Sequence, residues 1–190
     1  IPNGEVEKSD IKSLCAAYEQ KIVDLGGIDL QILGIGHNGH IGFNEPGSGI
    51  HTKTRLINLD QTTRMANAYE FATISDVPRL AITMGISTIL TSKKIILMGW
   101  GEGKSTAIYN AVEKESTDKV PASLLQNHDE TIFVLDEAAA SKLTRFTHPW
   151  LTGEVLWTPK LMKKAVRWFV TELKLSLTRL ICMRLRRLYR

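Results

Sequence analysis

The sequence predicts an α/β fold in which helices flank a parallel sheet. Three short apolar runs have strand character, at residues 28–35 (IDLQILGI), 94–98 (KIILM) and 131–135 (TIFVL). Segments with helical periodicity separate these runs, and such alternation is typical of a parallel sheet with right-handed crossovers. The length of 190 residues and the hydrophobic content of 43% are sufficient for one domain with its own core.

The first helix is expected to begin at Ser9 or Asp10 and to end at Leu25, before Gly26-Gly27. Apolar side chains recur along it at helical spacing, at Ile11, Leu14, Cys15, Tyr18 and Ile22. The remaining elements are expected to be helices at 61–71, 102–112 and 137–143, and a short apolar segment at 80–84 that follows Pro78. Ligands of parallel sheets bind beyond the carboxyl ends of the strands, so the loops after Ile35, Met98 and Leu135 are the candidate site.

The last helix is predicted from an N-cap signal. Thr158 is an N-cap residue type, Pro159 fits the first turn, and apolar residues then share one face, at Leu161, Ala165, Phe169 and Leu173. We expect a single α/β domain over residues 1–175, followed by a basic tail over residues 176–190.

Composition and charge exclude several classes of protein. No apolar run approaches the ~20 residues of a membrane span and no signal-peptide pattern is present. The two cysteines, Cys15 and Cys182, are too few for a disulfide framework or a metal knuckle. We therefore expect a cytoplasmic protein without a membrane partner.

Basic residues concentrate at one end of the chain. Residues 160–190 hold ten Lys or Arg and a single acid, Glu172, so residues 1–159 carry about −5 of the net charge of +4. A nucleic-acid-binding protein usually has its basic patch on the folded body, so no nucleic-acid partner is expected. The tail is interpreted as a solvated end, with an anionic partner or surface as the alternative.

The loop after the first strand, residues 34–47 (GIGHNGHIGFNEPG), is the most informative segment. Its first six residues match the dinucleotide fingerprint G-x-G-x-x-G, with Asp60 further along, but turn residues follow at 44–49 where the fingerprint requires a helix. His37, His40 and Glu45 are metal-ligand types, yet their spacing fits no helical zinc motif. We therefore expect neither a nucleotide cofactor nor a metal.

Acid–base chemistry on a sugar fits the loop better. Histidine exchanges protons near neutral pH, which makes His40 the candidate base, with Glu45 to orient it and Asn38 to hold a hydroxyl. Gly36, Gly39 and Gly42 allow backbone N–H groups to approach an oxygen-rich ligand. The alternative is that His40 has no chemical role and only holds the loop in its conformation.

The run GIGHNGHIGFNEPGS resembles the signature of the glucosamine-6-phosphate deaminase family, which is related to 6-phosphogluconolactonase. The likeness continues through residues 54–67, 77–85 and 95–104 and reaches about Trp150, and the later part is similar to a divergent bacterial branch. The resemblance implies a Rossmann-like parallel sheet. It also implies that glucosamine 6-phosphate is converted to fructose 6-phosphate and ammonia, an isomerisation with deamination that needs no organic cofactor.

The resemblance also implies roles for single residues. His40 would open the sugar ring by taking the proton of the anomeric hydroxyl, assisted by Glu45 and Asn38, where many relatives carry Asp. Lys104 would bind the sugar phosphate. Relatives have a phosphate-binding arginine near the position of Tyr69, and Arg64 is the candidate to substitute for it.

Two features of the family are absent from the sequence. The aspartate that moves the C2 proton and the S-G-G-x-T-P phosphate loop lie upstream in relatives, and neither occurs among the 39 residues that precede His40. We therefore expect a domain truncated at its N-terminal side, which retains the ring-opening half of the site.

Three other functions stay open. A 6-phosphogluconolactonase-like lactone hydrolase would share the fold, although Asn44-Glu45-Pro46 favours the deaminase. A non-catalytic sugar-phosphate-binding protein or inactive fragment would fit the missing aspartate. An unrelated interaction protein would depend on the tail at 176–190. A homo-oligomer is compatible with each.

Overall fold

The computed structural model describes residues 1–3 and 6–172 of the chain. They divide into two compact units, Ile1–Leu143 and a second that begins at Thr144. The domain boundary predicted at residue 175 and the basic tail lie outside the described residues, as does Leu173.

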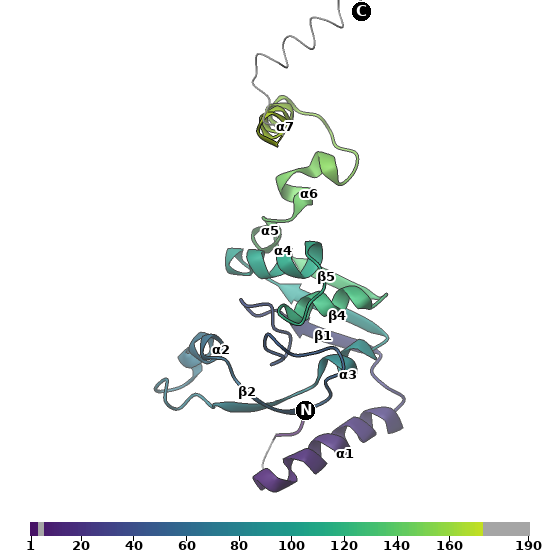
Figure 1. Cartoon of the computed structure of the whole chain (residues 1–190), viewed down its shortest axis with the longest axis vertical. Helices are drawn as coiled ribbons and strands as arrows, with labels where there is room; N and C mark the ends of the chain where they lie inside the picture. The colour runs from purple at the N-terminus through teal and green to yellow at the C-terminus, as the bar shows by residue number, and fades with distance from the viewer. Residues whose placement is uncertain (4–5, 173–190) are drawn as a thin grey trace, which may run out of the picture. The chain divides into compact units, whose positions relative to one another are not determined.

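The first unit is built on a parallel sheet of three strands, β1 (Leu30–Gly34), β4 (Lys94–Gly99) and β5 (Thr131–Leu135). The strands lie in the order β1-β4-β5, so the chain crosses over from β1 to the central strand β4 (Figure 1). In register, Leu33 of β1 is paired with Leu97 of β4, which in turn is paired with Phe133 of β5. All three strands were predicted as strands, and the parallel sheet is confirmed.

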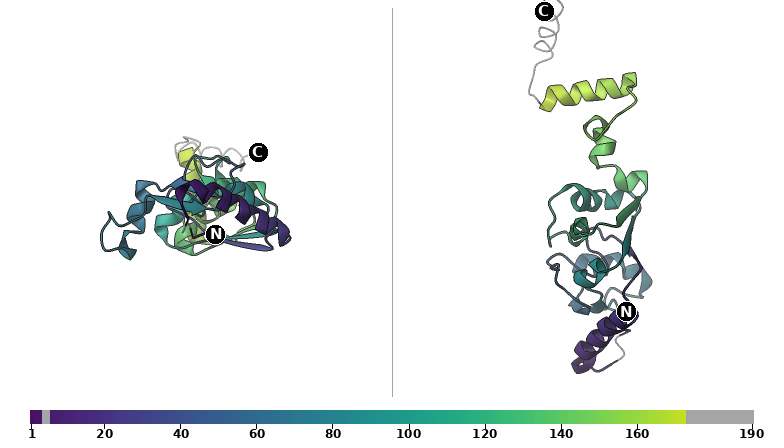
Figure 2. Two further views of the ribbon diagram at one scale, coloured as in Figure 1. Left: turned by 90° about the horizontal axis from the view of Figure 1, so that it is seen from below. Right: turned by 90° about the vertical axis from the view of Figure 1, so that its right-hand side faces the viewer.

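Helical segments bury one face of this sheet. Ile95 and Leu97 of β4 are fully buried in one core cluster with Ile108 of α4 (Ser105–Glu113) and Leu125 of the 3₁₀ segment η4 (Pro121–Asn127). Figure 2 shows the ribbon from two further sides. On the opposite face, apolar side chains stay 37–56% exposed, at Leu30, Ile32, Met98, Ile132 and Val134. The sheet therefore has its core on one side among the described residues.

Two other helices complete the frame of the first unit. The predicted N-terminal helix is confirmed as α1 (Ile11–Asp24), and a short helix that was not predicted, α3 (Ile86–Leu90), is almost fully buried. The predicted helix at 137–143 is shorter than expected, because α5 (Glu137–Ala140) ends after one turn. The predicted helix at 102–112 begins as the 3₁₀ turn η3 (Glu102–Lys104) before it continues as α4.

A small antiparallel pair lies outside the main sheet. It consists of β2 (Arg55–Asn58), which was not predicted, and β3 (Leu80–Thr83), which was predicted as an apolar segment. The helix predicted at 61–71 joins them, but its α-helical part is limited to α2 (Gln61–Ala66), which is followed by the 3₁₀ turn η2 (Ala68–Glu70). Asn67 follows the end of α2, where its backbone N–H and its side-chain amide both donate to the carbonyl of Thr63, at 3.2 and 2.7 Å.

The described part of the second unit contains the short elements α6 (Thr144–Thr147) and η5 (Pro149–Leu151) and the longer helix α7 (Pro159–Glu172). The predicted N-cap is confirmed, because the hydroxyl of Thr158 accepts the backbone N–H of Leu161 at 3.2 Å. Aromatic rings pack together in this unit, at His148, Trp150, Trp157 and Trp168. No helix within the described ranges is long and apolar enough to span a membrane.

Candidate functional site

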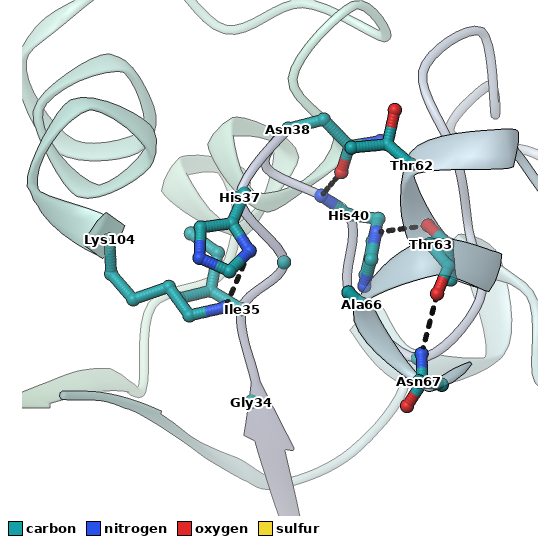
Figure 3. A pocket seen from close by; sticks show the side chains of 12 residues that line it. Gly34, Ile35, His37, Asn38, His40, Thr62, Thr63, Ala66, Asn67 and Lys104 are labelled. Atoms are coloured by element: carbon teal, nitrogen blue, oxygen red, sulfur yellow. Dashed lines mark hydrogen bonds between the residues drawn. The ribbon is translucent and has the colours of Figure 1, made fainter. Parts of the chain in front are cut away.

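A cavity of about 370 Å³ lies beyond the carboxyl end of β1 (Figure 3). Its wall comes from three segments: the loop that follows β1, the helix α2, and Lys104 at the end of η3. The loop contributes four of the predicted site residues, Gly36, Asn38, His40 and Gly42. The strand-end position is the one that the sequence predicted for a ligand of a parallel sheet.

Glycine is required at two positions of this loop. A Cβ on Gly36 would lie 2.2 Å from Cε1 of the His40 ring, so the imidazole rests directly on the Gly36 backbone. Gly39 has a φ of 84°, and a Cβ there would lie 2.7 Å from Cγ1 of Val120. The loop is closed by backbone hydrogen bonds from Gly36 N to His40 O and from Gly39 N to Gly36 O, at 2.9 and 3.1 Å. These contacts fix the imidazole at the cavity wall.

His40 belongs to a hydrogen-bonded group with Glu45, Asn38 and Thr63. Nδ1 of His40 lies 3.4 Å from Glu45 Oε2, and the two side chains are only 18% and 13% exposed. Asn38 Nδ2 donates to the same Glu45 oxygen at 2.8 Å, and Asn38 Oδ1 accepts the backbone N–H of His40 at 3.2 Å. Glu45 does not line the cavity, but three residues that do line it, His40, Asn38 and Thr63, contact its carboxylate.

The environment of His40 favours its neutral form. Burial of the imidazole lowers its pKa below the ordinary value of 6.5, and the nearby Lys104 and His37 act in the same direction. The charge and hydrogen bond of Glu45 oppose this shift without reversing it. Near neutral pH the ring is therefore an uncharged proton acceptor, with a carboxylate in place to stabilise the charge that it gains.

Lys104 supplies the cation of the cavity. Its Nζ lies 3.5 Å from His37 Nδ1, and burial lowers the pKa of its ammonium group. The preceding turn is held by Asp136, whose two carboxylate oxygens both accept the backbone N–H of Gly101 at 3.0 Å. Asp136 follows β5 and does not line the cavity, so among the described residues the loop after β5 supports the turn before Lys104 without forming the wall.

Asn44 lies in the loop that follows β1 and hydrogen-bonds this loop to neighbouring segments of the chain. It is fully buried, and its Nδ2 donates to the carbonyls of Ile41 and Met84 at 3.0 and 2.7 Å. Its Oδ1 accepts from Arg55 of β2 at 2.9 Å, so one amide joins the loop to β2 and to the segment after β3. Three of its four hydrogen-bonding positions are used.

Arg64 is not brought to the cavity. Although it lies on α2, its Nη2 donates to the carbonyls of Ile74 and Val77, both at 3.1 Å, and it is absent from the cavity wall. It therefore holds the segment before β3 in place. Its role as a phosphate ligand stays a prediction.

The cavity wall also contains residues that sequence reasoning missed. Thr62, Thr63 and Asn67 of the α2 region line it, and His37, which was considered only as a metal ligand, faces Lys104. The only sequence signal for the threonines was that they lie in the stretch 54–67 that carried the family resemblance. Within the described ranges, no group of His, Cys, Asp and Glu side chains is arranged to hold a metal ion.

The chain belongs to the family described as glucosamine-6-phosphate isomerases/6-phosphogluconolactonase, whose sequence model matches residues 2–134. This match contains every residue of the cavity wall, and the fold agrees with it. The chain is similar to the solved structure of a monomeric glucosamine-6-phosphate deaminase, with a TM-score of 0.71 and 45% identity. This match covers 74% of the present chain and 58% of the deaminase chain. A 6-phosphogluconolactonase from Trypanosoma cruzi shares the fold, with a TM-score of 0.56 and 22% identity over 74% of this chain and 55% of its own.

The chain is also similar in sequence to proteins named as deaminases or deaminase-like. The glucosamine-6-phosphate deaminase of Clostridioides difficile is 50% identical over 143 residues, which are 75% of this chain and 57% of the relative. A glucosamine-6-phosphate deaminase-like protein of Bacteroides thetaiotaomicron is 44% identical over 167 residues, which are 88% of this chain but 25% of that longer protein. The chain therefore spans somewhat more than half the length of the deaminase and a quarter of the longer relative.

Proposed function

We propose that this chain carries the ring-opening part of a glucosamine 6-phosphate deaminase site. The observation that supports the proposal best is the state of His40, which lines the cavity as a neutral base backed by Glu45. Relatives that are 44–50% identical are named deaminases or deaminase-like. The ligand would be an amino-sugar phosphate.

In the proposed step, Nε2 of His40 takes the proton of the hydroxyl on C1 of the sugar. The C1–O5 bond breaks as the C1 carbonyl forms, and O5 takes up a proton, which the imidazolium can return. Glu45 stabilises the transient imidazolium through Nδ1, at 3.4 Å. Deamination to fructose 6-phosphate and ammonia then requires transfer of the C2 proton to C1 and addition of water, which are proton transfers that need no organic cofactor.

Lys104 is the residue that we assign to the phosphate group. A phosphate dianion near Nζ would restore the charge stabilisation that burial removes, and lysine binds phosphate as a flexible point charge. His37, 3.5 Å from Lys104, lies on the same side of the cavity and can donate a further hydrogen bond.

A sugar-phosphate-binding protein without turnover is the second candidate. None of the described residues that line the cavity is Asp or Glu, so this wall offers no carboxylate to move the C2 proton. The likeness to the lactonase concerns the fold alone, at 22% identity, and lactone hydrolysis remains an alternative without a separate observation in its favour. A homo-oligomer and a cytoplasmic location stay predictions.

Binding and turnover should be measured separately on the same preparations. Glucosamine 6-phosphate is titrated calorimetrically into the wild-type chain, the variant His40→Gln and the control His51→Gln, which changes an exposed histidine outside the cavity. Ammonia release is then assayed for each. The deaminase proposal predicts release by the wild type and the control, and loss of release in His40→Gln with binding retained.

Each other result has a definite meaning. Saturable binding without ammonia from any of the three proteins would favour the binding protein. Absence of binding by the wild type would refute both candidates. Release of ammonia by His40→Gln at the wild-type rate would remove His40 from the reaction.

A further inference from the structure

We propose that Thr63 is a positioning residue that fixes the tautomer of His40, so that Nδ1 carries the hydrogen and Nε2 is the proton acceptor. Its importance for catalysis rests on the proposed deaminase function. The tautomer itself is a property of the free protein and does not depend on that function.

The hydroxyl of Thr63 has one hydrogen and two neighbours that compete for it. Thr63 is 3% exposed, and its Oγ1 lies 2.5 Å from Glu45 Oε1. The same oxygen lies 3.4 Å from His40 Nδ1 (Figure 3). A carboxylate oxygen only accepts hydrogen bonds, so the short contact requires that Thr63 donates its hydrogen to Glu45. Toward His40, the Thr63 oxygen can then act only as an acceptor.

This assignment determines where the imidazole hydrogen lies. Nδ1 of His40 faces two acceptors, the Thr63 oxygen and Glu45 Oε2, each at 3.4 Å. A hydrogen on Nδ1 satisfies both, whereas a lone pair there would face two other lone pairs. Nε2 has no hydrogen-bond partner among the residues that the structure describes, and it is left with its lone pair for the ligand.

Two hydrogen bonds, one to each oxygen, hold the carboxylate of Glu45 in its orientation. Asn38 Nδ2 donates to Glu45 Oε2 at 2.8 Å while Thr63 donates to Oε1, so neither oxygen can rotate away without losing a hydrogen bond. Thr63 in turn is fixed by α2, whose N-cap Asp60 accepts the backbone N–H of Thr62 at 2.7 Å and whose end at Asn67 is bonded to the Thr63 carbonyl. The orienting contact therefore comes from an element far from the loop in sequence.

The tautomer can be measured directly on the ligand-free chain by long-range ¹H–¹⁵N correlation spectra above the pKa of His40. The wild type, Thr63→Val and Thr63→Ser are compared, and the variant His40→Gln assigns the signals. The ring of His128, bonded to the carbonyl of Ser92 at 2.7 Å, serves as an internal reference for an intact fold.

We expect the Nδ1–H tautomer in the wild type, a shift toward Nε2–H in Thr63→Val, and its reversal in Thr63→Ser. Where ammonia is released, Thr63→Val should lower kcat/KM by about 10-fold or more, a part of the ~10²–10⁴-fold that a positioned base contributes. A wild-type ring with its hydrogen on Nε2 would overturn the proposal without any variant. So would a Thr63→Val spectrum unchanged at His40. Absence of ammonia from every variant would count against the deaminase function only.

Discussion

Replacement of Gly36 by alanine tests whether the position of His40 matters. The added Cβ would lie 2.2 Å from Cε1 and 2.4 Å from both ring nitrogens of His40. Ordinary carbon contacts are about 3.5–4.0 Å, so the imidazole must move by about 1.3–1.8 Å. The backbone of Gly36 is not in the left-handed region, so the substitution introduces no other strain.

The displacement should appear in both activity and stability. A misplacement of about 1 Å can cost ~10²-fold in rate, so kcat/KM for ammonia release should fall about 100-fold, which corresponds to about 2.7 kcal/mol. Overpacking should lower the free energy of unfolding by about 1–3 kcal/mol in urea titrations. If the chain alone releases no ammonia, the resonance of His40 Cε1 reports the movement of the ring.

Gly34→Ala is the matched control for this prediction. Gly34 lines the same cavity, and a Cβ there meets no atom within 4 Å. It should retain kcat/KM within about threefold and the His40 resonance of the wild type, a change below about 0.7 kcal/mol. The reasoning is refuted if Gly36→Ala is as active and as stable as Gly34→Ala.

Three further substitutions test the site. Lys104→Met should weaken the binding of glucosamine 6-phosphate, measured by calorimetry, by about 10- to 100-fold, since a hydrogen bond to a charged group contributes about 1.5–3 kcal/mol. An equal loss of affinity in the control Lys12→Met, which changes an exposed lysine, would contradict the assignment of Lys104 to the phosphate. Asn44→Ala removes three buried hydrogen bonds and should lower the unfolding free energy by about 3 kcal/mol, against little change in exposed Asn58→Ala. Because burial lowers the folded-state pKa of His40 below 6.5, the unfolded chain binds more protons as pH falls. The stability of the wild type relative to His40→Gln should therefore be greatest above pH 6.5 and decline below it. A constant or rising difference toward low pH would refute the stated cause.

The sequence predicted the sheet because parallel strands are marked by local patterns. The apolar run 94–98 corresponds to β4, which buries Ile95 and Leu97 in the core, and helical periodicity identified α1. The end of the predicted helix at 61–71 could not be read in this way. It depends on whether Asn67 faces solvent or bonds the Thr63 carbonyl, which helical propensity does not determine.

The candidate site loop after β1 was also predictable in part. His40, Asn38 and Glu45 are close in sequence, so a short turn brings them together, and the structure places them within hydrogen-bonding reach. Thr63 lies 18 residues beyond Glu45, and its contact requires that α2 folds back over the loop. The position of Arg64 also depends on the fold, because its guanidinium donates to the carbonyls of Ile74 and Val77, contacts that the sequence pattern does not indicate.

Asn38 suits this cavity to an anionic ligand, because its side chain is uncharged and donates a hydrogen bond to Glu45. An aspartate, which the resemblance leads one to expect at this position, could accept the backbone N–H of His40 but could not donate to Glu45. It would also place a negative charge at the cavity wall, close to that of Glu45. With asparagine, the Glu45 charge lies behind His40 and is covered by donors, while the wall itself carries Lys104 and two histidines and no carboxylate among the described residues. Under the proposed function, the phosphate of the sugar would meet a cation at the cavity edge, and the buried carboxylate would act through the side chains that it orients, His40 above all.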